Sequence, residues 1–442
     1  MRVLTEEGLM MRVLAEVVEV PFEGDGAGHG PLSWGQIESW NAVRALGHWM
    51  PLGGVEPIAP GTSLDDVLGE LRYHMCRHAT LRTRLHVPPD GGTPAQEVFA
   101  RGTLTVEVYD DADPQEVAGR YRDRPLDFTA EWPIRAAVVR RDGVPAHLVA
   151  VVSHFATDGA GAKIMLREAR ERPDTPVEGL APLEQARWQA SPPGRRQNTA
   201  ALRHLDGIVR TMPPVRFPVP DVPRNPRYWR AAFDSAALPL ALRALTDRTD
   251  VDPAVSLLAV FAAAVAETSG IDPVVVRPLV SNRFRAGLGG VVCTAVQAGL
   301  CLIDTAGDFD DVVERARRAA LAGYKYAYFD QRDLHALLDR TAAERGEQLQ
   351  IGCFLNDRRG PVPMDAPPEA EIRAALPRSE LRWITRQDRP ALEPLIVDVE
   401  DGPDGYRLTL HSDTRWLAPE DAERLLWSME AIAVRHAWPR RP

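Results

Sequence analysis

The segment Ser-His-Phe-Ala-Thr-Asp-Gly at residues 153–159 combines residue types that acid–base chemistry can use. An imidazole exchanges protons near neutral pH, so His154 could act as a general base. Asp158 could pair with an arginine and orient the local backbone, and Gly159 would let the chain turn tightly. The chain contains 11 histidines, and an isolated histidine is more often a core or surface residue than a catalyst. The case for His154 therefore depends on the elements around it.

Two predicted elements flank this segment. The apolar run at 147–152 is typical of a buried strand, and residues 134–139 predict a partner strand across a turn at Asp142-Gly143. Good helix formers follow at 160–172. The segment thus lies between the end of a strand and the N-terminus of a helix, where backbone N–H groups and the helix dipole converge. Gly159 and the first N–H groups of this helix could stabilise a developing oxyanion.

Helices and strands are mixed along the whole chain. Its 442 residues favour two or three domains. Two proline-rich stretches, 173–193 and 213–226, bracket a predicted helix at 198–212 and indicate a boundary between two lobes. Further predicted helices cover 64–75 (with Ser63 as N-cap), 114–121, 255–268, 309–322 and 419–436; further predicted strands cover 11–20, 98–109, 274–280, 395–399 and 406–410.

The pattern His-x-x-x-Asp-Gly at 154–159 resembles the active-site motif of condensation domains of nonribosomal peptide synthetases and their acyltransferase relatives, which carry His-His-x-x-x-Asp-Gly. Three further segments are similar to segments of that family and follow the same order: Leu-Ser-Trp-Gly-Gln at 32–36, Arg-His-Ala-Thr-Leu-Arg-Thr at 77–83 and Leu-Val-Ser-Asn-Arg at 279–283. Cys-Phe-Leu-Asn at 353–356 is a weaker match. The chain departs from the family at Ser153 (for the first histidine), Ala79 (for a glutamate) and Leu279 (for a proline).

The resemblance implies an α/β (α+β) fold with two lobes like those of chloramphenicol acetyltransferase, in a V-shaped arrangement with a central substrate tunnel. The chain is identified as a free-standing member of this CoA-dependent acyltransferase superfamily. We expect the first lobe, which carries the Ser-His-x-x-x-Asp-Gly motif, at residues 11–190. The second lobe is expected at residues 195–442.

The resemblance also assigns roles to single residues. His154 matches the catalytic histidine, which would accept or position the proton of an incoming amine or hydroxyl. Asp158 matches the acid that supports the motif, and Arg283 matches the arginine that usually pairs with this acid across the two lobes. Ser153 and Gly159 complete the structural residues of the active site. The candidates for the substrate channel are Arg77, Arg82, Ser281 and Asn356.

The implied reaction is acyl transfer from a thioester to an amine, which gives an amide, with ester formation as the next choice. The donor would be linked to the phosphopantetheine arm of a carrier protein that acts in trans, or to coenzyme A. A small-molecule amine or alcohol would be the acceptor. No tightly bound cofactor is implied, and the family usually works as a monomer.

Ser153, at the position of the first motif histidine, has two interpretations. In the first, that histidine mainly supports the fold, so that a hydroxyl can replace it and activity survives. In the second, catalysis has decayed and the chain is a silent scaffold that recruits carrier proteins or tailoring enzymes such as cytochrome monooxygenases. Because His154, Asp158 and Gly159 all remain, we favour activity. A CoA-dependent acyltransferase that forms esters is the other alternative.

Composition narrows the function classes further. The chain has 52 Lys and Arg against 62 Asp and Glu, and this net charge of -10 argues against a nucleic-acid partner. No stretch approaches the roughly 18 apolar residues of a membrane span, so neither a membrane nor secretion is expected. The four cysteines are far apart and fit a reducing cytoplasm.

His74 and His78 are the candidates for a metal site. They are four residues apart and could share one helix face, yet no glutamate follows His74 as the metalloprotease pattern requires, and Cys76 lies on another face. Packing of the helix end into the lobe is the favoured interpretation. No metal is therefore expected.

Overall fold

The computed structural model describes residues 14–218, 220, 224–362, 365–388 and 395–438. The chain divides into two compact units: unit 1 comprises Met1–Arg195 and Ser281–Val296, and unit 2 comprises Arg196–Val280 and Gln297–Pro442. We call Ser281–Val296 the returning segment. The sequence places this segment in the second lobe, whereas here it belongs to unit 1, because its backbone and side chains bond to the end of a unit 1 strand and to the helix that follows.

The sheet of unit 1 has the strand order β1-β6-β7-β8-β3. Only β6 and β7 are parallel. Its strands are β1 (Leu14–Glu23), β3 (Pro51–Pro57), β6 (Arg101–Asp110), β7 (Ile134–Arg141) and β8 (Val144–Ser153). Asp142 and Gly143 join β7 to β8 with φ angles of 51° and 74°, as a two-residue hairpin turn with left-handed central residues requires. The predicted hairpin is therefore confirmed.

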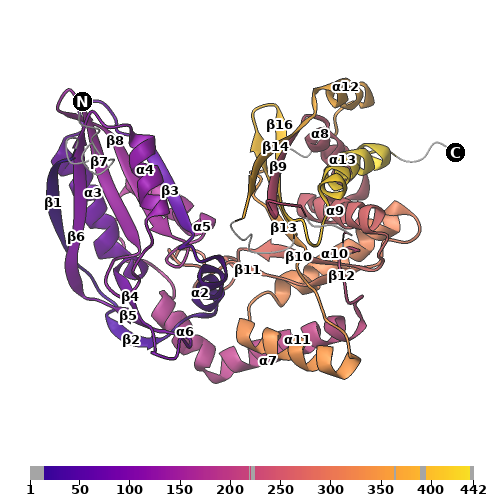
Figure 1. Cartoon of the computed structure of the whole chain (residues 1–442), viewed down its shortest axis with the longest axis horizontal. Coiled ribbons are helices and arrows are strands. Elements are labelled where there is room, and N and C mark those ends of the chain that lie inside the picture. Colours follow the sequence, from indigo (N-terminus) through magenta and orange to yellow (C-terminus); the bar gives the residue numbers. More distant parts are fainter. Residues whose placement is uncertain (1–13, 219, 221–223, 363–364, 389–394, 439–442) are drawn as a thin grey trace. The chain divides into compact units, whose positions relative to one another are not determined.

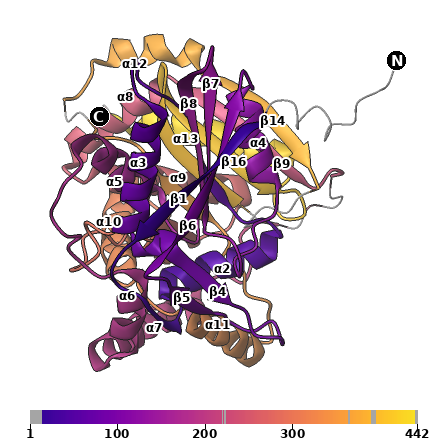
Figure 2. The same cartoon turned by 90° about the vertical axis from the view of Figure 1, so that its left-hand side faces the viewer.

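Two helices cover one face of this sheet, α3 (Leu64–Arg77) and α5 (Gly159–Glu171) (Figures 1 and 2). Helix α3 begins with a capping box formed by Ser63 and Asp66, as its sequence predicts. Its apolar face packs on alternate residues of the strands, because successive side chains of a strand point to opposite faces. The core of this face includes Val67, Leu71, Met75, Val106, Ala136, Val138 and Val152.

The remaining elements of unit 1 surround this sheet. Helix α4 (Pro114–Asp123) follows β6, and α2 (Trp34–Leu46) is capped by Ser33 and Gln36. A small second sheet joins β2 (Gly28–Pro31), β5 (Ala95–Val98) and β4 (Thr83–His86), with the short helix η1 (Ala79–Arg82) before β4. Helix α6 (Pro182–Ala190) leads to α7 (Pro192–Thr211), which passes from unit 1 into unit 2.

The sheet of unit 2 has the order β11-β10-β13-β15-β16-β9-β14, with β12 also paired to β10. Its strands are β9 (Tyr228–Ser235), β10 (Val274–Val280), β11 (Gln297–Ala298), β12 (Cys301–Ile303), β13 (Phe354–Asp357), β14 (Glu380–Gln387), β15 (Leu395–Gly402) and β16 (Gly405–Asp413). Its helices are α8 (Ala237–Thr249), α9 (Pro253–Ser269), α10 (Phe309–Lys325), α11 (Gln331–Arg345), α12 (Glu369–Ala375), the short η2 (Leu376–Arg378) and α13 (Pro419–His436).

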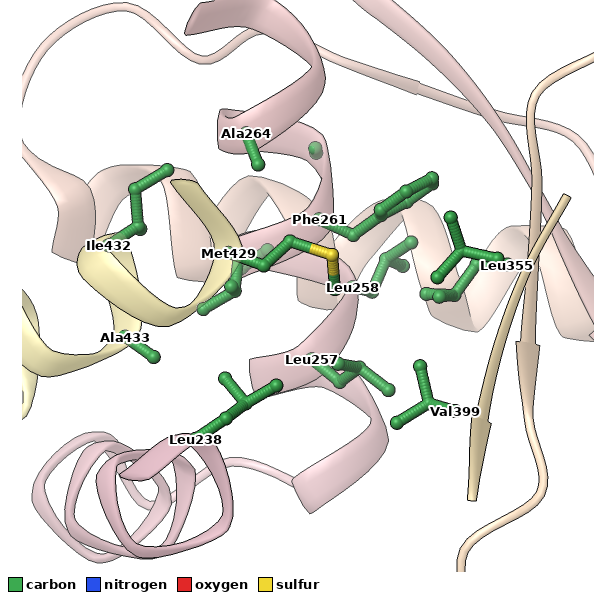
Figure 3. Close-up of a cluster of buried hydrophobic side chains, with 14 of the residues drawn as sticks. Leu238, Leu257, Leu258, Phe261, Ala264, Leu355, Val399, Met429, Ile432 and Ala433 are labelled. Atoms are coloured by element: carbon green, nitrogen blue, oxygen red, sulfur yellow. The ribbon is translucent and has the colours of Figure 1, made fainter. Parts of the chain in front are cut away.

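Helix α9 is the centre of the unit 2 core. It is apolar on almost every side, and such a helix must be buried all round. Figure 3 shows Leu257, Leu258 and Phe261 of α9 between α8, α13 and the strands. Leu238 of α8 and Met429 of α13 belong to the same cluster. The predicted helices at 255–268 and 419–436 and the predicted strand at 274–280 therefore exist, with ends close to the predicted ones.

Several elements differ from the sequence-based expectation. The proline-rich stretch 173–193 contains α6, and α7 begins at Pro192, before the predicted residue 198. Pro182 and Pro192 occupy the first helical position, where a missing N–H costs nothing. Of the predicted strand at 11–20, residues 11–13 lie outside the described residues, and the rest belongs to β1.

Among the described residues, no single helix combines the length and the apolar character that crossing a membrane requires. The pair α8 and α9 meets that test of length and composition only when both helices are taken together, and the two are bent by 111°. Residues of both helices are buried in the core of unit 2.

Candidate active site

His154 lies in the turn between β8 and α5. Backbone hydrogen bonds fix this turn on both sides: the N–H of Ser153 donates to the carbonyl of Pro133 at 2.8 Å, and the N–H of His154 donates to that of Met50 at 2.9 Å. The N–H of Ala156 then bonds back to Ser153 at 2.9 Å. The histidine is therefore carried by a backbone that neighbouring strands hold in place.

Ser153 is fully buried, and its hydroxyl joins two parts of this turn. Its Oγ donates to the carbonyl of Trp49 at 3.1 Å and accepts from the N–H of Phe155 at 3.2 Å. A serine hydroxyl both donates and accepts, so this one side chain satisfies two buried backbone groups next to His154. The structure thus gives Ser153 a supporting role in the turn.

Asp158 caps the N-terminus of α5. Its Oδ1 accepts from the N–H of Gly161 at 2.8 Å and from Nη2 of Arg283 at 2.7 Å. Its Oδ2 accepts from the N–H groups of Ala295 and Val296 at 2.9 and 3.1 Å. The residue is 2% exposed, and a buried carboxylate needs such partners. Asp158 therefore fastens the returning segment to the His154 turn.

Arg283 completes this arrangement from the returning segment. Besides Asp158, its guanidinium donates to the carbonyls of Leu288 and Cys293 at 3.0 and 2.8 Å, and to that of Val291. Asp158 and Arg283 are 125 residues apart in the chain, and the structure brings them together within unit 1. The pair is an internal support of the His154 turn.

His154 is a partly exposed residue, but the Nδ1 atom of its ring is buried and has no regular hydrogen-bond partner. Burial lowers the pKa of His154 below its usual value, while the carbonyl of His154 itself and the charge of Asp158 act in the opposite direction. That carbonyl accepts hydrogen bonds from the hydroxyls of Thr294 and Ser39. Burial therefore favours the neutral imidazole of His154.

No family model matches the chain. Its sequence is 28% identical over 256 residues to the AMB antimetabolite synthetase AmbB of Pseudomonas aeruginosa. The aligned region covers 52% of this chain and 20% of that protein. It is 26% identical over 326 residues to the phosphinothricin tripeptide synthetase PhsB of Streptomyces viridochromogenes. Here the aligned region covers 66% of this chain and 27% of that protein. The chain thus spans about a quarter or less of the length of these relatives.

Solved structures match the chain along nearly its whole length. A structure of condensation domain-mediated chain release from the enacyloxin polyketide synthase matches with a TM-score of 0.71 and 20% identity, over 95% of this chain and 84% of that one. The condensation domain of the Monacolin K polyketide synthase MokA also has a TM-score of 0.71, with 16% identity over 93% and 98%. The X-domain in its complex with OxyB from teicoplanin biosynthesis reaches 0.68, with 16% identity over 93% and 95%.

The chain has the condensation-domain fold. This finding confirms the resemblance that the motifs indicate and the expected α/β class. The turn after His154 needs a glycine at Gly161 and not at Gly159, where the sequence led us to expect it. Gly159 has no positive φ, and a Cβ atom there would meet nothing within 4 Å, so the turn does not require this glycine. At Gly161 a Cβ atom would overlap the hydroxyl of Thr157 and press on the carbonyl of Cys293.

The four predicted channel residues of this condensation fold have different surroundings. Arg82 is 1% exposed, and its guanidinium donates to the carbonyls of Gly24 and Asp25 at 3.0 and 2.5 Å, and to that of Phe99. Ser281 is exposed at the start of the returning segment. Asn356 belongs to unit 2, where its Nδ2 donates to Asp398 at 2.7 Å. Arg82 is therefore committed to holding loops of unit 1.

Arg77, the fourth, lines a cavity of about 660 Å³ within unit 1. Its guanidinium donates to both carboxylate oxygens of Glu168 at 3.0 and 3.2 Å, and to the carbonyl of Thr175 at 2.6 Å. The side chain is 13% exposed. Arg77 thus ties the end of α3 to α5 and to the loop that follows α5.

His74, His78 and Glu168 are close enough for a metal site, since their ligand atoms all lie within 4.8 Å of one another. The donor set does not fit a metal ion, however. Arg77 occupies both oxygens of Glu168, and Nε2 of His78 lies 2.9 Å from Glu168 Oε2. A guanidinium beside the carboxylate would also repel a cation. We assign these four residues to a buried ion network, which we call the Glu168 network.

The pKa values of the Glu168 network agree with this assignment. The hydrogen bonds from His78 and Arg77 lower the pKa of Glu168 to about 2, although burial acts in the opposite direction. Burial, with the neighbouring His78, lowers the pKa of His74 to about 4. Glu168 is therefore ionised and His74 is neutral at neutral pH.

Proposed function

We propose that the chain catalyses a condensation in natural-product biosynthesis, in which a thioester-bound acyl or aminoacyl group is joined to an amine. The imidazole of His154 is the general base. The observation that carries this proposal is the setting of His154: the residue is partly exposed in the turn between β8 and α5, and burial lowers its pKa, which favours the neutral imidazole that can accept a proton.

The amine nitrogen attacks the thioester carbonyl carbon, His154 takes a proton from that nitrogen, and the carbon–sulfur bond breaks. The proton then goes to the departing sulfur, and the products are an amide and a free thiol. A positioned general base of this kind accelerates such a step by about 10²–10⁴-fold.

The chain's own backbone offers donors for the oxyanion in this proposal. The N–H of Gly161 is committed to Asp158 Oδ1, and that of Ala162 donates to the Asp158 carbonyl at 2.9 Å. We therefore assign the oxyanion role to the N–H groups of Gly159 and Ala160, which precede them at the start of α5.

The thioester donor in this proposal is linked to the phosphopantetheine arm of a carrier protein or to coenzyme A. A small-molecule amine is the acceptor. The names of the two curated relatives, both synthetases and one a tripeptide synthetase, support an amide product over an ester.

A silent scaffold is the second candidate, because one structural neighbour is an X-domain in complex with another protein, OxyB. The two proposals differ in what His154 does. A condensing enzyme loses its reaction when His154 is replaced, whereas a scaffold needs a binding surface and tolerates this change.

The experiment that tests the function compares metabolites by mass spectrometry. The organism that encodes the protein is compared with the same strain carrying His154→Ala, at equal protein levels. His147→Ala is the matched control, because His147 lies on the same strand β8 and its Nδ1 is also buried without a hydrogen-bond partner.

If a product disappears and two smaller precursors accumulate in the His154→Ala strain only, the condensation is established, and the mass difference identifies the bond formed. If His154→Ala leaves the metabolites unchanged while deletion of the protein alters them, the scaffold replaces the enzyme. Loss of product in both histidine variants would mean that the effect is structural.

A further inference from the structure

The backbone carbonyl of His154 accepts hydrogen bonds from two side-chain hydroxyls. Thr294 Oγ1 lies 2.5 Å from this oxygen and Ser39 Oγ lies 3.4 Å from it. Both donors are buried, with 2% and 5% of their surface exposed. They come from distant parts of the sequence, 140 and 115 residues away from His154. One carbonyl next to the catalytic ring is thus held by two separate elements.

The position of Thr294 is fixed from both sides. The N–H groups of Ala295 and Val296, which directly follow it, donate to Asp158 Oδ2. Helix α2 packs on its backbone, since a Cβ atom at Gly35 would overlap the carbonyl oxygen of Thr294. Ser39 lies one helical turn after Gly35, and residues four apart share one side of a helix. Asp158 and α2 together therefore bring both hydroxyls to the His154 carbonyl.

This carbonyl also acts on the His154 ring. It is the hydrogen-bonding group that raises the pKa of His154, against the larger effect of burial. A carbonyl oxygen has two lone pairs, and here two hydroxyls compete with the ring for them. Accordingly Nδ1 has no regular hydrogen-bond partner. An engaged carbonyl stabilises the protonated imidazolium less than a free carbonyl would.

We propose that Thr294, assisted by Ser39, is a positioning residue that occupies the carbonyl of His154 and thereby helps to keep the ring neutral. This inference rests on the proposed function of His154 as a general base. Asp158 is the charged group that acts directly on the ring, and Arg283 holds Asp158 from the other side. Thr294 and Ser39 act through the carbonyl and do not touch the substrate in this proposal.

The test measures the pKa of the His154 ring by NMR in the full chain with ¹⁵N-labelled histidine, without any substrate. The signal of His154 is assigned from its absence in His154→Gln. Thr294→Val removes the hydroxyl and keeps the shape of the side chain. One neutral hydrogen bond corresponds to a shift of about 0.5–1 pH unit, so the pKa of His154 should rise by that amount. Thr294→Ser should restore the wild-type value.

Thr80→Val is the matched control. Thr80 is 1% exposed, and its hydroxyl donates to the carbonyl of Ala156 at 2.7 Å, two residues after His154 in the same turn. This variant loses the same kind of buried hydrogen bond, so a comparable fall in the melting temperature is expected with no change in the His154 pKa. Ser39→Ala should raise the pKa by less than Thr294→Val, because its hydrogen bond is longer.

An unchanged or lowered His154 pKa in Thr294→Val would overturn the inference, and so would an equal shift in Thr80→Val. If Thr294→Val does not fold, Ser39→Ala decides: a rise in the pKa supports the inference and no rise refutes it. Because the measurement needs no turnover, its result is independent of the metabolite experiment. In an active enzyme, Thr294→Val should also move the acidic limb of the kcat profile to higher pH and leave KM unchanged.

Discussion

The His154 turn and the Glu168 network involve the two ends of the same helix, α5. Each has a buried carboxylate paired with an arginine: Asp158 with Arg283 at 2.7 Å, and Glu168 with Arg77 at 3.0 Å. They differ in what happens to the histidine. Glu168 bonds His78 directly, whereas the carboxylate of Asp158 accepts from Arg283 and backbone N–H groups and leaves the His154 ring uncommitted.

This difference separates a histidine that stabilises from one that can react. A histidine that is bonded to an ionised carboxylate and enclosed has no free nitrogen for a substrate. A histidine that is fixed only through its backbone keeps its ring available. Burial alone does not mark a reactive histidine, because it also lowers the pKa of His74, which stacks on His78 in the Glu168 network.

If His154 is the proposed base, replacing it should lower activity strongly without unfolding the protein. His154→Ala is expected to lower kcat by about 10²–10⁴-fold, the usual contribution of a general base, with little change in the melting temperature. His78→Ala should do the reverse and cost about 1–3 kcal/mol of stability, since it removes a hydrogen bond from a buried carboxylate. Activity assays and thermal unfolding on both variants check this. If His154→Ala and His78→Ala lost the same activity and had the same stability, the two histidines would not differ in the proposed way.

Removing the two arginines should have unequal effects on stability. Arg283→Ala leaves the buried Asp158 charge without its cation, which costs about 3–5 kcal/mol in comparable pairs. Arg77→Ala should cost less, about 1–3 kcal/mol, because Glu168 keeps the hydrogen bond to His78. Urea unfolding gives both free energies. A larger loss of stability in Arg77→Ala would mean that the Glu168 network, rather than the pair of Asp158 and Arg283, is the main internal support of unit 1.

The low pKa of His74 should make the stability of the protein depend on pH. Its pKa is about 4 in the folded protein and about 6.5 when unfolded, so the unfolded chain binds more protons in this interval. Stability therefore falls as the pH drops from 6.5 to 4, by up to about 3 kcal/mol from this residue.

His74→Gln should flatten the curve of unfolding free energy between pH 6.5 and 4. The contribution of Glu168 is lost at lower pH, between its ordinary value of 4.5 and about 2, so the two effects can be separated. An unchanged slope in His74→Gln would contradict the neutral state of His74.

The smallest effect is expected at Ser153. Ser153→Ala leaves the carbonyl of Trp49 and the N–H of Phe155 without their side-chain partner, which should cost about 1–2 kcal/mol. Activity should fall less than tenfold, because the ring of His154 is untouched. Unfolding and rate measurements on Ser153→Ala check this, with Ser153→Thr as the variant that keeps the hydroxyl. A loss as large as that of His154→Ala would give Ser153 a direct part in the reaction.

The sequence predicts best what is local. The β7–β8 hairpin follows from Asp142-Gly143, and the start of α3 follows from Ser63, because their signals lie within a few residues. Proline misled the prediction at 173–193, since Pro182 and Pro192 begin helices there. The pairing of Asp158 with Arg283 was predicted from the family resemblance and not from any local pattern.

The role of Thr294 could not be predicted, because nothing near residue 294 marks it and its partner is 140 residues away. The sequence offered one signal, Gly35, which is a small residue in a motif that matches the family. The sequence does not show that Gly35 packs against the backbone of Thr294. The Glu168 network was missed for the same reason: Glu168 is 91 residues from Arg77. The V-shaped arrangement of lobes and the tunnel stay predictions.

The central claim is that the chain itself condenses two molecules and that His154 is its base. The most direct measurement adds purified protein to an extract of the His154→Ala strain and follows the accumulated precursors by mass spectrometry. The wild-type protein should convert them to the missing product, and purified His154→Ala, folded to the same melting temperature, should not. If both proteins restore the product equally, His154 is not the base and the account of this site is wrong.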